Sequence, residues 1–148
     1  MKANMDVVSI NRGKETFSVC PKPPIYLTDV AKKYYSQMGT ILVRKDGLKE
    51  TYLNALEIYA EAMAQWYFAV TEIKKRNKND YGSGYIQVFK TGAKNISVEM
   101  TVKNNAEDTL LKCFKLFGLD PKSEKELKGT TAPGQLNFFE EMMKLKNG

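Results

Sequence analysis

The side chains with the greatest potential for chemistry are cysteines and carboxylates, because the 148-residue sequence contains no histidine. Without an imidazole, Ser–His and Cys–His nucleophiles, a histidine general base and every His-containing zinc site are excluded. Cys20 and Cys113 lie too far apart in the sequence for a metal knuckle or a CxxC redox pair. Most one-domain enzyme chemistries are therefore disfavoured. We expect no metal site, no cofactor and no reactive thiol.

The carboxylates and the glycine-rich loop offer no clear alternative chemistry. Glu50, Glu57 and Glu61 lie on one expected helix, with the last two one turn apart. Metal-assisted phosphodiester hydrolysis needs several carboxylates that converge on two ions, so we interpret these side chains as solvated charges on a helix face. The loop at 82–84 (GSG) lacks the Lys-Ser/Thr that binds phosphate and magnesium in nucleotide-binding loops, and it is interpreted as a turn. The sequence predicts no catalytic residues.

The composition is that of one domain with a tail. The chain is 43% hydrophobic and 27% charged, with a formal net charge of +6, and one domain of about 150 residues accounts for most of it. No apolar run approaches the roughly 20 residues of a membrane span, and the first residues lack an apolar signal core. Together with two unpatterned cysteines, this predicts a cytoplasmic protein that is not bound to a membrane. The modest basic excess permits binding to polyanions without requiring it.

Three regions can be distinguished along the chain. Residues 1–24 are polar and end in a proline-rich run, which predicts an extended leader. Residues 25–128 carry the helical patterns and form the predicted helical domain. Residues 129–148 begin with a Gly/Pro joint and continue as a short amphipathic segment, which either folds back on its own domain or docks on a partner.

The first helix has recognisable start and stop signals. Thr28 is expected to cap it, with Asp29 at its positive end. The apolar side chains that follow recur at three- and four-residue steps. Gly39 weakens this helix, and we expect Gly47 to end it just past the last apolar turn.

The clearest pattern in the chain is an apolar seam whose members alternate at spacings of four and three residues, the period of helix packing. The members are Tyr52, Leu56, Tyr59, Met63, Trp66, Val70 and Ile73. The seam predicts a helix from about Lys49 to Arg76, roughly 40 Å long. Either it only spans a helical hairpin, or part of it also packs against another subunit. We predict that Tyr59, Met63, Trp66 and Val70 contact a returning helix and, in part, neighbouring subunits.

The periodicity changes after Asn77. Alternating residues at 85–89 and 96–98, with a turn between them, predict a short β-hairpin. Helical spacing resumes at about Met100 and ends at Gly118, which a Pro follows. The expected fold class is mainly α: an N-terminal helix pair with a long central helix, a short β-hairpin, a returning helix and a short amphipathic C-terminal segment.

Basic residues concentrate at the ends of the first two helices. Cations at the end of a helix partly neutralise its dipole, and phosphate contact is the alternative explanation. A helix pair with a tight turn is also compatible with a helix-turn-helix reader of DNA. The candidate nucleic-acid-binding residues are Lys32, Lys33, Arg44, Lys45, Lys74, Lys75, Arg76 and Lys78.

The ordered series of features resembles the small terminase subunits of tailed bacteriophages. The resemblance rests on PPIYLT at 23–28 followed by AKKYY at 31–35, on YAEAMA at 59–64, on GYIQV at 84–88 and on LFGLDPKS at 116–123. It extends from about Pro23 to Leu127. The sequence departs from the family where Ser123 is followed by Glu124, since relatives usually carry a Ser-Arg pair there.

The resemblance implies that the helical domain at 25–128 is a domain for DNA binding and oligomerisation. Family members form oligomers, often rings, recognise double-stranded viral DNA at the packaging start, and deliver it to a large subunit that holds the ATPase and nuclease. They have no catalytic residues of their own, and they act in the host cell cytoplasm. The C-terminal segment is then expected to dock on the large subunit or another packaging component. Its candidate docking residues are Leu136, Phe139, Met142 and Met143.

Two other functions remain open from the sequence. One is a small dimeric DNA-binding transcriptional regulator of the helix-turn-helix type, which would bind a short symmetric site. The other is a structural or adaptor protein whose charge is incidental.

Overall fold

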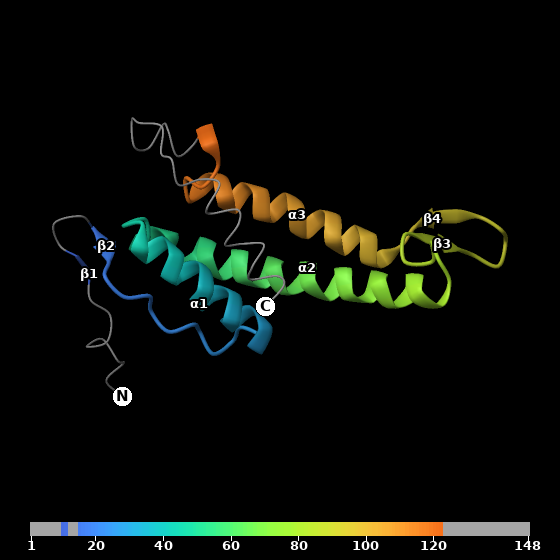
Figure 1. Ribbon diagram of the computed structural model, residues 1–148, viewed down its shortest axis with the longest axis horizontal. Helices are drawn as coiled ribbons and strands as arrows, with labels where there is room; N and C mark the ends of the chain where they lie inside the picture. Colours follow the sequence, from blue (N-terminus) through green and yellow to red (C-terminus); the bar gives the residue numbers. More distant parts are fainter. Residues whose placement is uncertain (1–9, 12–14, 123–148) are drawn as a thin grey trace. The chain divides into compact units, whose positions relative to one another are not determined.

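A computed structural model describes residues 10–11 and 15–122 of the chain. The chain divides into two compact units, Met1–Leu110 and Leu111–Gly148. The elements in chain order are β1 (Ile10–Asn11), β2 (Thr16–Phe17), α1 (Asp29–Arg44), the 3₁₀ turn η2 (Glu50–Tyr52), α2 (Leu53–Asn79), β3 (Ile86–Val88), β4 (Lys94–Ile96) and α3 (Val98–Leu116) (Figure 1). The predicted mainly α fold with a short hairpin is confirmed.

The start of α1 follows the sequence signals. The Thr28 side chain accepts a hydrogen bond from the backbone N–H of Ala31 at 3.2 Å, as expected for an N-cap residue. Leu27, directly before the cap, is buried.

The end of α1 differs from the expectation in one residue. Asp46, with φ 54°, takes the left-handed position after the helix, and Gly47 does not. The backbone N–H of Gly47 donates to the Leu42 carbonyl oxygen at 2.8 Å, which completes a Schellman motif with the aspartate at its turning point. Aspartate tolerates this conformation better than most residues do.

The core of the first unit lies where α1 packs against α2. One face of each helix is buried, and Figure 1 shows α1 lying along the first half of α2. On α1 the buried residues are Ala31, Tyr34, Tyr35, Met38, Gly39, Ile41 and Leu42; on α2 they are Leu56, Tyr59, Ala60, Ala62, Met63, Ala69 and Ile73. The alanines on α2 permit the close approach of a second backbone.

The segment expected as an extended leader contains a pair of strands. β1 and β2 pair antiparallel, with Ile10 opposite Phe17. Phe17 is buried, and its backbone N–H donates to the carbonyl oxygen of the fully buried Leu48 at 2.8 Å. This part of the segment is therefore tied to the connection between α1 and α2.

Gly39 provides space for Cys20. A Cβ at position 39 would lie 2.2 Å from Cys20 Sγ and 3.3 Å from Leu56 Cδ2. The glycine that weakens α1 by propensity therefore lets the segment before the helix pack onto it. Burial raises the pKa of the Cys20 thiol from 9.0 to about 11.

The burial of Cys20 predicts that its thiol reacts slowly with alkylating reagents. In a Cys113→Ser variant, Cys20 should react with iodoacetamide far more slowly at pH 8 than in the unfolded chain, because only the thiolate is nucleophilic. The rate should keep rising with pH towards 11. Because the pKa of the thiol is higher in the folded than in the unfolded chain, burial of the neutral thiol contributes its full stability below the unfolded-state pKa. That contribution is lost as the pH rises through the folded-state pKa. Adding Gly39→Ala should displace the thiol and restore fast alkylation; equal rates in the two variants would contradict the contact.

The first part of α3 returns along α2 in the opposite direction. Arg76 near the end of α2 forms an ion pair with Glu99 in the first turn of α3, with Nη2 and Oε1 2.8 Å apart. Almost three turns earlier on α2, Trp66 Nε1 donates to Glu107 Oε1 at 3.1 Å. These two contacts confirm the predicted returning helix.

Leu111–Lys122 is the described part of the second unit. It contains the last turns of α3, which end in a second Schellman motif with Gly118 at φ 71°. The backbone N–H of Leu119 donates to the Phe114 carbonyl oxygen at 2.9 Å. The predicted stop at Gly118 is confirmed.

Candidate nucleic-acid interface

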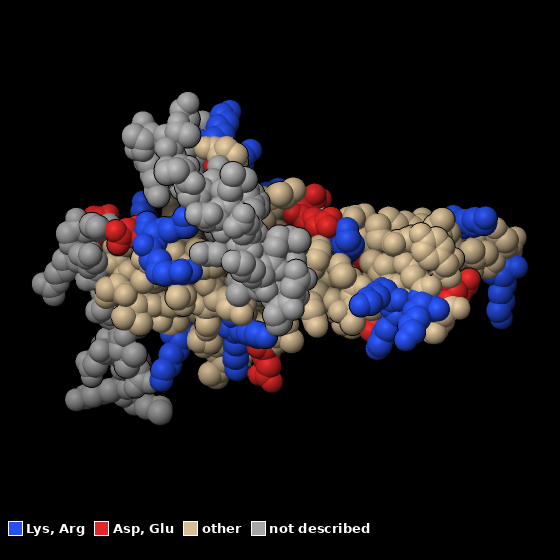
Figure 2. Space-filling model, in the orientation of Figure 1, with Lys and Arg blue, Asp and Glu red and all other residues tan. Residues whose placement is uncertain are grey.

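The C-terminal end of α2 carries the densest group of basic side chains on this helix. Lys74, Lys75, Arg76 and Lys78 are all exposed. Figure 2 shows basic side chains gathered over this end of α2, next to the hairpin. The helix dipole favours cations there, but it does not require four of them within five positions.

These four basic residues differ in whether they form an ion pair. Arg76 is held by Glu99, whose side chain is only 13% exposed. Lys75 Nζ lies 3.4 Å from Glu72 Oε1 in an exposed pair of the kind that contributes little. Lys74 and Lys78 form no ion pair within the described part of the chain. These two lysines are therefore the cations most available for a phosphate.

Glu99 has a further consequence for Arg76. Its second carboxylate oxygen, Oε2, is buried and has no hydrogen-bond partner among the described residues. The carboxylate is thus committed to Arg76. It orients the guanidinium and neutralises part of its charge.

The loop after α2 is fastened to the helix by Asn77. Its Oδ1 atom accepts hydrogen bonds from the backbone N–H groups of Gly82 at 3.1 Å and Gly84 at 2.9 Å. Ser83 Oγ lies 2.9 Å from the Arg76 carbonyl oxygen, to which it donates. The glycine-rich loop is thus a turn held against the end of α2, as interpreted from the sequence.

Ser97 connects the loop, the hairpin and α3. It is fully buried, its Oγ donates to the Gly84 carbonyl oxygen at 2.7 Å, and it accepts from the backbone N–H of Met100 at 3.1 Å. Its own N–H donates to the Tyr85 carbonyl oxygen at 2.9 Å. Sequence reasoning missed Ser97 and Asn77. A serine directly before a helical pattern is the cap signal that would have identified the first of them.

Ser97→Ala should destabilise the first unit by about 1–2 kcal/mol, because it removes an N-cap and leaves the Gly84 carbonyl oxygen without this donor. Urea denaturation followed by circular dichroism measures the change. Ser97→Thr retains the hydroxyl and serves as the control. If alanine and threonine cost the same, the hydroxyl does not provide the stabilisation.

The basic residues of α1 do not join this cluster. Lys32 and Lys33 lie near its start and Arg44 and Lys45 at its other end, about 18 Å further along the helix. Lys32 Nζ lies 4.0 Å from Asp29. The C-terminal end of α2 is roughly 37 Å from its first residue, so the eight predicted residues form three separate groups.

The predicted oligomerisation residues have two kinds of environment. Tyr59 and Met63 are each 1% exposed and lie in the core of the chain. Trp66 and Val70, further along α2, are half-buried. The same helix also exposes three large apolar side chains outside the predicted set. These are Ile58, Tyr67 and Phe68.

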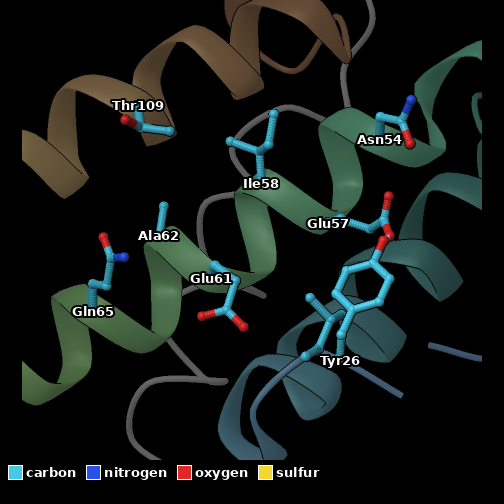
Figure 3. Close-up of a pocket in the computed structure, with 9 residues that line it drawn as sticks. Tyr26, Asn54, Glu57, Ile58, Glu61, Ala62, Gln65 and Thr109 are labelled. Carbon is cyan, nitrogen blue, oxygen red and sulfur yellow. The ribbon is translucent and has the colours of Figure 1, made fainter. Parts of the chain in front are cut away.

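The two carboxylates on α2 fasten the segment before α1. Glu57 accepts a hydrogen bond from the Tyr26 hydroxyl, and Glu61 accepts one from the Thr28 backbone N–H at 3.1 Å. Both line an open groove (Figure 3) that also includes Thr109 of α3. They therefore position the start of α1, whose positive end favours a carboxylate. Among the described residues, no group of three or more acidic or cysteine side chains is placed to hold a metal ion.

The described residues thus form a helical protein in which the basic C-terminal end of α2 is joined by hydrogen bonds to the loop that leads into the β3–β4 hairpin. The family described as phage terminase, small subunit, matches residues 31–133 of the 148. The chain therefore belongs to the phage terminase small-subunit family, whose members are generally non-catalytic, and this indicates a role in phage DNA packaging. No curated protein and no solved structure matches the chain.

None of the helices in the described part of the chain has the length and apolar character to cross a membrane. The predicted partner-docking residues, Leu136, Phe139, Met142 and Met143, lie outside the described part of the chain.

Proposed function

We propose that this protein is a non-catalytic, oligomeric terminase small subunit. It binds double-stranded viral DNA at the packaging start and recruits and regulates the large ATPase-nuclease subunit in the host cytoplasm. Family membership over residues 31–133 supports the packaging role. The single observation that carries DNA binding is the exposed cluster at the end of α2, in which Lys74 and Lys78 have no ion pair within the described residues.

Oligomerisation would strengthen this binding. Several weak phosphate contacts become adequate when copies act together, because the later contacts are made at a high effective concentration. Trp66 and Val70 are half-buried, and Tyr67 beside them exposes a large apolar side chain, so this part of α2 is our proposed subunit contact. The segment 129–148 is the proposed docking element for the large subunit.

The connection between α1 and α2 favours this function over a helix-turn-helix regulator. It runs from Lys45 to Tyr52 and contains a 3₁₀ turn, whereas the turn of a helix-turn-helix has about 3–4 residues. A regulator of that type would be a dimer on a short symmetric site. Light scattering should instead show an assembly larger than a dimer, and the assembly should raise the ATPase rate of a supplied large subunit.

The DNA interface is tested by charge reversal. Lys74→Glu combined with Lys78→Glu should weaken binding to duplex DNA at least tenfold, because two phosphate contacts are lost and two repulsions are introduced. Fluorescence anisotropy at salt concentrations from about 50 to 200 mM measures the affinity and its steep salt dependence. Lys112→Glu combined with Lys115→Glu makes the same change of charge elsewhere and should have little effect. If both pairs behave like the wild type, the cluster does not bind DNA.

A further inference from the structure

The hairpin formed by β3 and β4 is cationic and contains no acidic residue. Residues 81–98 include no Asp or Glu, and Lys90 and Lys94 flank the turn between the strands. Both lysines are exposed and form no ion pair within the described chain. Figure 2 shows basic side chains at the end of the hairpin as well as over the end of α2. None of the family features and none of the predicted DNA-binding residues includes these two lysines.

Within the described residues, the β3–β4 hairpin has no second surface packed over its apolar face. Ile86 pairs with Ile96 and Val88 with Lys94, so these four side chains share one face of the ribbon. Ile86, Val88 and Ile96 are 49%, 62% and 45% exposed. Two isolated strands are marginal in water and need a surface to pack on. The ribbon therefore presents an apolar and basic face outward.

The base of the hairpin is rigidly attached. Asn77 holds Gly82 and Gly84 against the last turn of α2, and Ser97 joins Gly84 and Tyr85 to the start of α3. The lysines of the ribbon and those at the end of α2 are therefore parts of one fixed structure. A single extended polyanion that reached both groups would require no rearrangement of the loop between them.

We propose that the β3–β4 ribbon is a DNA-contacting arm that lies in a groove of the duplex bound at the end of α2. Lys90 and Lys94 contact backbone phosphates, while the aliphatic side chains face the groove wall. A two-stranded β-ribbon fits the major groove of B-DNA, where apolar side chains can contact thymine methyl groups. This inference rests on the proposed DNA-binding function, and it adds the element and the residues that make the contact.

Charge favours DNA over a second copy of this chain as the occupant. The ribbon has no acidic residue, and the neighbouring end of α2 is also basic, so two copies meeting through this region would repel each other. Asp80 is the one acidic residue of the connection from α2 to the hairpin, and it is exposed. A polyanion meets no comparable repulsion.

The test compares salt dependence in neutralised variants. Each lysine that contacts a phosphate contributes about 1 to the slope of log affinity against log salt concentration. Lys90→Gln combined with Lys94→Gln should therefore lower the slope by about 2 and weaken binding roughly tenfold or more near 0.1 M salt. The assay uses the full chain with a labelled duplex of about three helical turns. Lys112→Gln combined with Lys115→Gln is the matched control and should keep the wild-type slope.

The outcomes separate this inference from the proposed function. If neutralising Lys74 and Lys78 lowers the slope but neutralising Lys90 and Lys94 does not, the ribbon is not a DNA arm, although the protein still binds DNA. If the ribbon variant instead changes the mass in light scattering at an unchanged slope, the ribbon is a self-association surface and the proposal fails. If the wild type shows no salt-dependent binding to the duplex, both ideas are wrong.

Discussion

Replacing Trp66 by aspartate is expected to destabilise the protein by about 3–5 kcal/mol, the range for removal of a large packed aromatic side chain. The indole is half-buried between α2 and the returning part of α3, and its Nε1 donates to Glu107 Oε1. Aspartate removes the packing and the donor, and it places a second carboxylate next to Glu107. Urea denaturation followed by circular dichroism measures the loss of stability, and light scattering measures any loss of assembly.

Trp66→Phe separates packing from hydrogen bonding. Phenylalanine retains most of the apolar surface and removes only the donor, so we expect a cost of about 1 kcal/mol. Glu107 keeps its contact with Lys103 Nζ at 2.7 Å, so its carboxylate still has a hydrogen-bond donor in this variant. A cost for aspartate no larger than that for phenylalanine would show that α3 does not pack on Trp66.

Gly84→Ala is expected to destabilise the first unit by about 2–3 kcal/mol, because a well-packed site has no space for the added methyl group. The new Cβ would lie 2.5 Å from the Ile73 carbonyl oxygen and 2.8 Å from Asn77 Oδ1. The first of these atoms belongs to the backbone of α2, which cannot move aside as a side chain can. The loop must therefore shift away from the helix and break the hydrogen bonds that Asn77 makes to it. Thermal unfolding and duplex binding should both be affected.

Gly92→Ala provides the control for this substitution. Gly92 has φ 85° at the turn of the hairpin, and no atom lies within 4 Å of an added Cβ. Only the cost of the left-handed conformation remains, about 1 kcal/mol. Equal destabilisation by the two variants would mean that the contact with Ile73 is not the cause.

The helices could be predicted from the sequence because their signals are local. The Thr28 cap, the apolar seam of α2 and the stop at Gly118 each depend on residues within one or two turns, and the structure has all three. The two strands of the β3–β4 hairpin were also predicted to within a few residues, whereas β1 and β2 were not predicted. The exception at the end of α1 is local as well: Asp46 takes the left-handed position although a glycine follows it.

The site depends on partners that local spacing does not reveal. Nothing near Arg76 in the sequence indicates that Glu99 neutralises it, and nothing near Gly39 indicates that Cys20 lies against it. Glu57 and Glu61 were interpreted as solvated charges, yet they hold Tyr26 and the start of α1. Each of these pairs joins residues that are brought together only when the helices pack.

By itself, the sequence determined the absence of imidazole chemistry, the succession of helices and hairpin, and the features by which the family is recognised. Apolar periodicity and helix caps depend on residues within a few positions of one another. They can therefore be recognised in the sequence without knowledge of how the rest of the chain folds. Only the tertiary structure decided which basic side chains lie together, which are neutralised, and that Asn77 and Ser97 fasten the hairpin to the end of α2. Charge and burial at a surface depend on distances through space, and those are set when the helices pack.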